Sequence, residues 1–121
     1  MSDPVTAEQV LDAVEELLRS GWTRRAWART PNGTAVNWKS PDACQFCLTG
    51  ALYRIGMKLD VEVIPFMNAM KKSILVPSLA SFNDNLATDF SDILHLISQT
   101  REVASDIEVC KPWGSHVPLG Q

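Results

Sequence analysis

Two cysteines, Cys44 and Cys47, lie three residues apart in the stretch CQFCLTGALYRIG. A pair at this spacing can supply two of the four ligands of a zinc site, with Cys110 and His116 completing a Cys₃His set. The same pair can do redox chemistry if a helix dipole lowers the pKa of the first thiol. It can also supply a nucleophile, with His95 or His116 as its base.

The alternative is that both cysteines are small apolar residues on the buried face of a helix, since free cysteine is among the most buried residue types. Two ligands within one helix and two in a tail are a weak zinc signature. Thioredoxin-like chemistry needs a preceding strand, and none is predicted here. We therefore predict no metal site and no cofactor, and we favour the buried-face interpretation, above all for Cys47.

A second group of residues is suited to binding a partner. Between Glu16 and Asp42 the chain has no acidic residue, while basic and tryptophan side chains alternate there. Such a surface can grip phosphates and stack bases, or it can meet an acidic protein, because Trp and Arg are enriched at interface hot spots. The alternative is a solvated hairpin with its tryptophans against the core. The predicted partner-binding residues are Arg24, Arg25, Trp27, Arg29, Trp38 and Lys39.

Acidic residues dominate the other end of the chain. Residues 84–108 hold six Asp and Glu against Arg101. We expect a solvated helix face, with self-association between this face and the basic hairpin of another copy as the alternative. Asn83-Asp84 is predicted to form an Asx turn before the last helix.

Capping residues, apolar spacing and turn residues predict the elements that position these groups, beginning with a capping box at Thr6-Ala7-Glu8-Gln9. Gly50 lies inside a predicted helix, so we expect another backbone to approach it closely. The predicted elements are a helix over 7–20, a hairpin pairing 25–30 with 34–38 through Asn32-Gly33, a helix from Ser40-Pro41-Asp42 to Gly56, a helix from Asp60 or from near Pro65 to 73, a short turn over 77–82, and a helix capped by Thr88 and ending near 105.

These elements predict a mainly α, single compact domain of about four helices with one short β-hairpin. We assign the domain to residues 1–107 and an irregular tail to 108–121. The hydrophobic content of 45% is enough for one core, and the net charge of −3 gives no general attraction to nucleic acid. An odd cysteine count, a polar N-terminus and the lack of a long apolar run predict a cytoplasmic protein without a membrane span.

The order of four short motifs resembles a known family. These are Gly21-Trp22, Asn32-Gly33, the run Cys47–Leu52 and Ser81-Phe82-Asn83-Asp84. The resemblance covers about residues 8–105 and points to small bacterial and phage proteins catalogued as a domain of unknown function, the 6197 type. It implies a compact, mostly helical domain, often in a phage or prophage context, and carries no activity or catalytic residue.

We therefore expect a non-enzymatic module that binds a protein partner through the basic and aromatic hairpin, as an inhibitor or regulator of a host system. A nucleic-acid-binding protein using the same surface is the second hypothesis. A thiol or zinc protein using Cys44 and Cys47 is the third. The chain lacks a phosphate-binding loop and a metalloprotease motif, which lowers the expectation of enzymatic activity.

Overall fold

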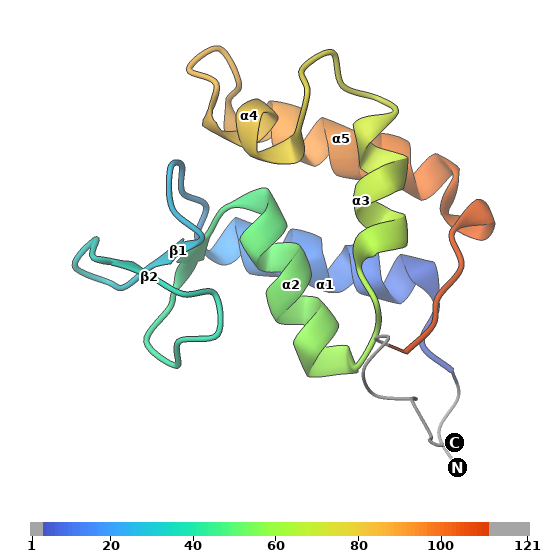
Figure 1. Cartoon of the computed structure of the whole chain (residues 1–121), viewed down its shortest axis with the longest axis horizontal. Helices are drawn as coiled ribbons and strands as arrows, with labels where there is room; N and C mark the ends of the chain where they lie inside the picture. Colours follow the sequence, from blue (N-terminus) through green and yellow to red (C-terminus); the bar gives the residue numbers. More distant parts are fainter. Residues whose placement is uncertain (1–3, 112–121) are drawn as a thin grey trace.

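A computed structural model of the chain describes residues 4–111, and in that range five α-helices surround a core with a small sheet at one end (Figure 1). The elements are α1 (Ala7–Ser20), β1 (Ala28–Arg29), β2 (Ala35–Val36), β3 (Gln45–Phe46), α2 (Leu48–Leu59), α3 (Ile64–Lys71), α4 (Leu79–Asp84), α5 (Phe90–Glu102) and a 3₁₀ turn, η1 (Ala104–Asp106). The prediction of a mainly α single domain with a short hairpin is confirmed.

The core forms where α1 packs against both α2 and α5, while α3 packs on α5 and α4 (Figure 1). The largest side chains buried there include Phe46, Phe66 and Met70. Burying each side chain of this size contributes about 1.5–3 kcal/mol relative to leaving it exposed. The hydrophobic core therefore fixes how the helices are arranged.

The first helix follows its sequence signals closely. The Thr6 hydroxyl accepts the Gln9 amide, and the Gln9 side chain accepts the Thr6 amide, so the predicted capping box is present. The helix buries Val10, Leu11 and Val14 at helical spacing. Both predicted bounds of this helix are confirmed.

The hairpin is also present, but its strands are shorter than predicted, since only residues 28–29 and 35–36 pair, and it is part of a larger sheet. β1 pairs antiparallel with β2 and with β3, giving the order β2-β1-β3. Gly33 in the predicted turn has a φ of 87°, which favours glycine. Gly50 lies so close to the chain just before β1 that a Cβ there would overlap the carbonyl oxygen of Trp27. The expected close approach to Gly50 is confirmed.

The predicted start of the second helix is wrong. Ser40-Pro41-Asp42 forms a turn in which the Ser40 hydroxyl accepts the Asp42 amide, and α2 begins only at Leu48. Pairing of Gln45–Phe46 with β1 satisfies backbone groups there, and this tertiary contact outweighs the local helix-start signal. Cys44 therefore precedes a strand and does not lie in a helical turn.

Three further boundaries differ from the prediction or refine it. α2 continues past Gly56 to Leu59 and ends at Asp60, which has a left-handed φ of 58°. α3 begins at Ile64, next to Pro65, and this agrees with the second of the two predicted starts. α5 is capped by Asp89 and not by Thr88, because the Asp89 carboxylate accepts the Asp92 amide and completes a capping box.

Asn83 holds three segments together, which corrects the prediction of a local Asx turn. Its side chain is 1% exposed. Its Oδ1 accepts the indole N–H of Trp22 at 2.7 Å and the amide of Leu48 at 3.0 Å. Its Nδ2 donates to the Thr23 carbonyl oxygen at 3.1 Å and to Oδ1 of Asp84 at 3.0 Å. All four hydrogen-bonding positions of this amide are therefore filled.

These bonds connect the end of α4 with the loop after α1 and with the start of α2. The carboxylate of Asp84 extends the connection, because it accepts the backbone N–H of Arg25 at 2.8 Å. Arg25 has a φ of 64°, a left-handed conformation that is uncommon for arginine. The link to Asp84 thus helps to set the direction in which the chain enters the hairpin.

Within residues 4–111, each helix is too short or too polar to cross a lipid bilayer.

Candidate functional site

Two of the six predicted partner-binding residues are used inside the molecule. The Arg24 guanidinium donates to the carbonyl oxygen of Thr88 and lies 4.6 Å from the centre of the Trp22 ring. The Arg29 guanidinium donates to the Thr23 hydroxyl at 2.8 Å and to the Arg24 carbonyl oxygen at 3.1 Å. Both arginines therefore brace the loop and the hairpin.

The other four residues face outward around a row of aromatic rings. Trp27 is 48% exposed, Trp38 is half-buried, and Arg25 and Lys39 are exposed. Tyr53 of α2 lies between the two tryptophans. Its ring centre is 5.8 Å from that of Trp27, edge to face, and 5.4 Å from that of Trp38, stacked. We name Trp27, Tyr53 and Trp38 the aromatic row.

Neighbouring groups hold the aromatic row in place. One nitrogen of the Arg54 guanidinium donates to the carbonyl oxygens of Trp38 and Ser40, each at 2.9 Å. This fixes the loop after β2 against α2. On the other side, the absence of a side chain on Gly50 lets the backbone of Trp27 approach α2. Each tryptophan is thus positioned through its own backbone, which leaves its ring at the surface.

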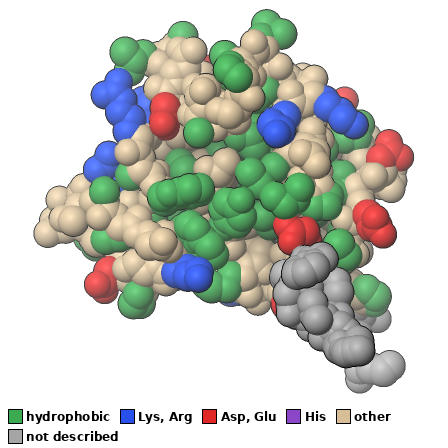
Figure 2. Space-filling view, viewed as in Figure 1, with side chains coloured by type: hydrophobic (Ala, Val, Ile, Leu, Met, Phe, Trp, Pro, Cys, Tyr) green, Lys and Arg blue, Asp and Glu red, His purple; other side chains and the backbone are tan. Residues whose placement is uncertain are grey.

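A hollow lies on each side of the aromatic row. The first, of about 290 Å³, is lined by Arg25, Ala26, Trp27, Cys47, Thr49, Ala80 and Asp84. The second, of about 370 Å³, is lined by Trp38, Lys39, Tyr53, Gly56, Met57, Asp60, Val61, Glu62 and Val63. Figure 2 shows hydrophobic side chains gathered in the middle of the face on which α2 overlies α1, with charged side chains around them. One exposed cation lies at each hollow: Arg25 at the first, together with Asp84, and Lys39 at the second, together with Asp60 and Glu62.

Sequence reasoning missed the contribution of α2 to this surface. Tyr53 joins the two tryptophans, and Met57, one turn later, is 50% exposed. The sequence did indicate a second, exposed side of α2. Tyr53 and Met57 are four residues apart, so they share a helix face, and they lie away from the buried stripe that includes Leu52 and Ile55. Only the fold shows that this side of α2 lies beside the hairpin.

Cys47 serves as the N-cap of α2. Its sulfur accepts the Gly50 amide at 3.2 Å and lies 3.2 Å from the Thr49 hydroxyl oxygen. The thiol is buried and satisfies one of the free amides at the helix start. The buried-face interpretation was right that Cys47 is buried. It was wrong about the position, because Cys47 lies at the N-cap of α2 and not on the apolar face of a helix.

The remaining candidate thiol and metal ligands that the structure describes are not brought together. Cys110 lies beyond the other end of α2, where its carbonyl oxygen accepts the Glu62 amide. Because a helix rises about 1.5 Å per residue, α2 is roughly 18 Å long, and Cys47 lies at its start while Cys110 lies beyond its end. His95 is exposed on α5, and His116 lies outside the described residues. Residues 4–111 contain no cluster of three or more Asp, Glu, His or Cys side chains suited to a metal ion.

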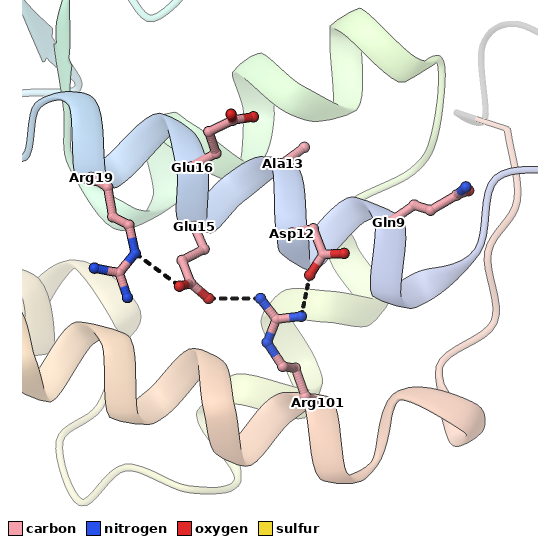
Figure 3. Close-up of a pocket in the computed structure, with 7 residues that line it drawn as sticks. All are labelled: Gln9, Asp12, Ala13, Glu15, Glu16, Arg19 and Arg101. Carbon is pink, nitrogen blue, oxygen red and sulfur yellow. Dashed lines mark hydrogen bonds and ion pairs between the residues drawn. The ribbon is translucent and has the colours of Figure 1, made fainter.

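A larger hollow of about 520 Å³ lies between α1 and α5, and four of the five charged groups that line it, all but Glu16, pair with one another (Figure 3). Arg101 of α5 forms ion pairs with Asp12 and with Glu15 of α1, the second at 2.6 Å. Glu15 also pairs with Arg19 at 2.9 Å. The hydrogen bond from Arg101 lowers the pKa of Glu15 below its ordinary value of 4.5, with Arg19 adding to the effect. These contacts hold α5 against α1, so we interpret the hollow as structural.

The cap at Cys47 gives a first prediction. We expect Cys47→Ala to reduce the free energy of unfolding by about 1 kcal/mol, because the Gly50 amide loses its acceptor. Cys47→Ser retains an acceptor and should stay within about 0.5 kcal/mol of the wild type. Urea denaturation measures both values. If serine destabilises the chain as much as alanine does, the thiol has a role other than capping.

The Glu15 ion pairs give a second prediction. Because the folded pKa of Glu15 is lowered, its contribution to stability is present above the ordinary pKa of 4.5 and is lost as pH falls through the folded value. Glu15→Gln should therefore be less stable than the wild type at pH 7, by about 0.5–1 kcal/mol, with a smaller difference at pH 3. Urea denaturation at both pH values tests this. Glu16→Gln, the adjacent exposed carboxylate, is the matched control, and equal pH dependence in the two variants would contradict the assignment.

Comparison with known proteins supplies a family but no activity. A model described as a family of unknown function, DUF6197, matches residues 2–103 of the 121 residues. No curated protein sequence matches the chain, and neither does any solved structure. The resemblance seen in the motifs from Gly21-Trp22 to Ser81–Asp84 is confirmed, and the chain belongs to DUF6197, a family of unknown function.

Proposed function

We propose that this protein is a non-enzymatic protein-binding module, and that the aromatic row contacts an acidic segment of its partner. The observation that carries this proposal is the exposure of Trp27 and Met57, about half of each, beside a hollow on either side of the row. Large apolar side chains that stay partly in water gain stability when a partner covers them. Trp and Tyr are also the residues most often found at interface hot spots.

The charges around the row favour an acidic partner. Arg25 and Lys39 are exposed, one at each hollow, and Lys39 Nζ lies 5.4 Å from the centre of the Trp38 ring. Three carboxylates also line these hollows, and each of them bonds within the chain: Asp84 accepts the Arg25 amide, Asp60 pairs with Lys111, and Glu62 accepts the Ile64 amide. The charged groups of Arg25 and Lys39, by contrast, form no ion pair within residues 4–111. Complementary charge steers association and aligns the partner along the surface.

The same surface is less well suited to nucleic acid. A protein that follows a phosphate backbone needs several free cations, whereas Arg24 and Arg29 donate to groups within the chain. The thiol or zinc hypothesis is weakened because Cys47 caps α2 and Cys110 lies beyond its other end. Protein binding is therefore the function that the surface supports best.

The setting of this function is part of the proposal. The family that the motifs resemble includes phage proteins, and on this ground we propose that the module inhibits or regulates a host system. All three cysteines are free thiols, which fits a reducing cytoplasm.

A position-specific crosslink tests the proposal. We would replace Trp27 with a photoreactive phenylalanine analogue in one variant and Leu86, which is exposed on the loop after α4, in a control variant. Irradiation should join the partner to position 27 and not to position 86. The partner is then purified, and its affinity is measured by calorimetry for the wild type, Trp27→Ala and Leu86→Ala.

We expect Trp27→Ala to weaken binding at least about tenfold while Leu86→Ala leaves it unchanged. Denaturation curves for both variants check that the fold is retained. Affinity unchanged by Trp27→Ala, or a crosslink from position 86 alone, would overturn the proposal. Capture of a second copy would point to self-association, and capture of nucleic acid with a steep salt dependence would support the second hypothesis in its place.

A further inference from the structure

We propose that the second hollow, beside Trp38, is the docking site of segment 112–121 of this same chain, with the indole of Trp113 as its anchor. Segment 112–121 lies outside the described residues. The support comes from the lining of the hollow, from the position of the last described residues and from the residue types of the segment. The docking goes beyond the proposed function, and its consequence for a partner rests on that function.

The second hollow, of about 370 Å³, has an apolar side chain that the described chain leaves partly open to water. The ring of Trp38 is not that side chain, because Tyr53 stacks on it and the Lys39 ammonium lies 5.4 Å from its centre. Met57 is 50% exposed and lines the same hollow, next to the buried Val61. A group that enters the hollow therefore gains stability chiefly by covering Met57.

The last described residues lie at the rim of this hollow. The carbonyl oxygen of Cys110 accepts the Glu62 amide at 2.8 Å. Lys111 Nζ lies 3.1 Å from a carboxylate oxygen of Asp60. Both Glu62 and Asp60 line the hollow, so the chain is held against two of its lining residues at the point where segment 112–121 begins.

Trp113 is close enough to reach the hollow, since only Pro112 separates it from Lys111. An extended chain spans about 3.3–3.6 Å per residue, so the Cα of Trp113 lies within roughly 7 Å of that of Lys111. Proline disfavours a helical backbone at the residue before it, which keeps the distance near this extended value. Because Lys111 already contacts Asp60, an indole at this distance can enter the hollow.

The residue types of the segment suit the hollow. Residues 112–121 contain no Asp, Glu, Lys or Arg, while Trp113, Val117 and Leu119 are large and apolar. The hollow is lined by one cation and two carboxylates, so an uncharged segment brings no like charge to either sign. An indole buries a large apolar area and makes favourable contacts with the sulfur of methionine, here that of Met57.

Covalent attachment favours this segment over a separate molecule. A group joined by a short linker has an effective concentration in roughly the millimolar range, so modest contacts are enough to hold it. A partner of the aromatic row that also uses the second hollow must displace the segment. Its apparent affinity then falls in proportion to the fraction of molecules in which the hollow is open.

Nuclear magnetic resonance of methionine methyl groups tests the docking on the full chain. The methyl signal of Met57, identified with Met57→Leu, is compared in the wild type, in Trp113→Ala and in Gln121→Ala, a control at the far end of the segment. An indole in contact with a methyl group shifts its signal upfield. The signal of Met70, which is buried in the core, is the internal control.

We expect Trp113→Ala to move the Met57 signal downfield and to leave that of Met70 in place, and we expect Gln121→Ala to move neither. The wild-type Met57 signal should be the same at all protein concentrations. A Met57 signal that is unchanged by Trp113→Ala would overturn the docking. A signal that moves downfield on dilution would overturn it too, because the hollow would then hold the segment of a second copy.

The consequence for a partner is measured with the protein captured by the crosslink at position 27. If the segment covers the hollow in about nine molecules of ten, Trp113→Ala should bind that protein about tenfold more tightly than the wild type does. Equal affinities would overturn the competition and leave the docking in place. A methyl shift as expected, together with a failed crosslink at position 27, would overturn the proposed function alone.

Discussion

The buried side chain of Asn83 is the constraint on which the rest of the structure depends. Three of its four hydrogen bonds join α4 to the loop after α1 and to the start of α2, and the fourth goes to the neighbouring Asp84 of α4. A buried polar group stabilises a fold only when its bonding positions are filled, and here every position has a partner. Because its partners on the other segments are two backbone groups and one indole, the amide fixes where the segments lie and leaves the outward-facing side chains unconstrained.

The proposed surface follows from that constraint. The loop held by Asn83 and Asp84 leads directly into β1, and α2 begins at the residue whose amide Asn83 accepts. The hairpin and α2 therefore start from a common point, and the row of Trp27, Tyr53 and Trp38 lies where they run side by side. Arg24 and Arg29 support this arrangement from inside, so the surface is built by buried polar bonds as well as by the hydrophobic core.

The sequence predicted those elements whose signals are local. The capping box at Thr6 and Gln9, the Asn32-Gly33 turn and the crowding at Gly50 were all recognisable, because each depends on residues close in the chain or on the size of one residue. Within the site, Trp27 and Trp38 were identifiable as candidate binding residues, because they lie among basic residues in a stretch without acidic ones. The local signals of Ser40-Pro41-Asp42 predicted a helix start that is absent from the structure. The pairing of β3 with β1 prevents it, and that pairing depends on residues far away in the sequence. The partners of Asn83 were beyond sequence reasoning for the same reason. The spacing of Tyr53 and Met57 indicated an exposed side of α2, but not that this side lies beside the hairpin.

The measurement that tests this account most directly is the free energy of unfolding of Asn83→Ala against Asn68→Ala, an exposed asparagine on α3. Asn83→Ala leaves the Trp22 indole, the Leu48 amide and the Thr23 carbonyl without their partner. The account predicts a loss of about 2–4 kcal/mol for this variant and less than about 0.5 kcal/mol for the control. Equal, small losses in the two variants would contradict it, because the segments would then be held together without the buried amide.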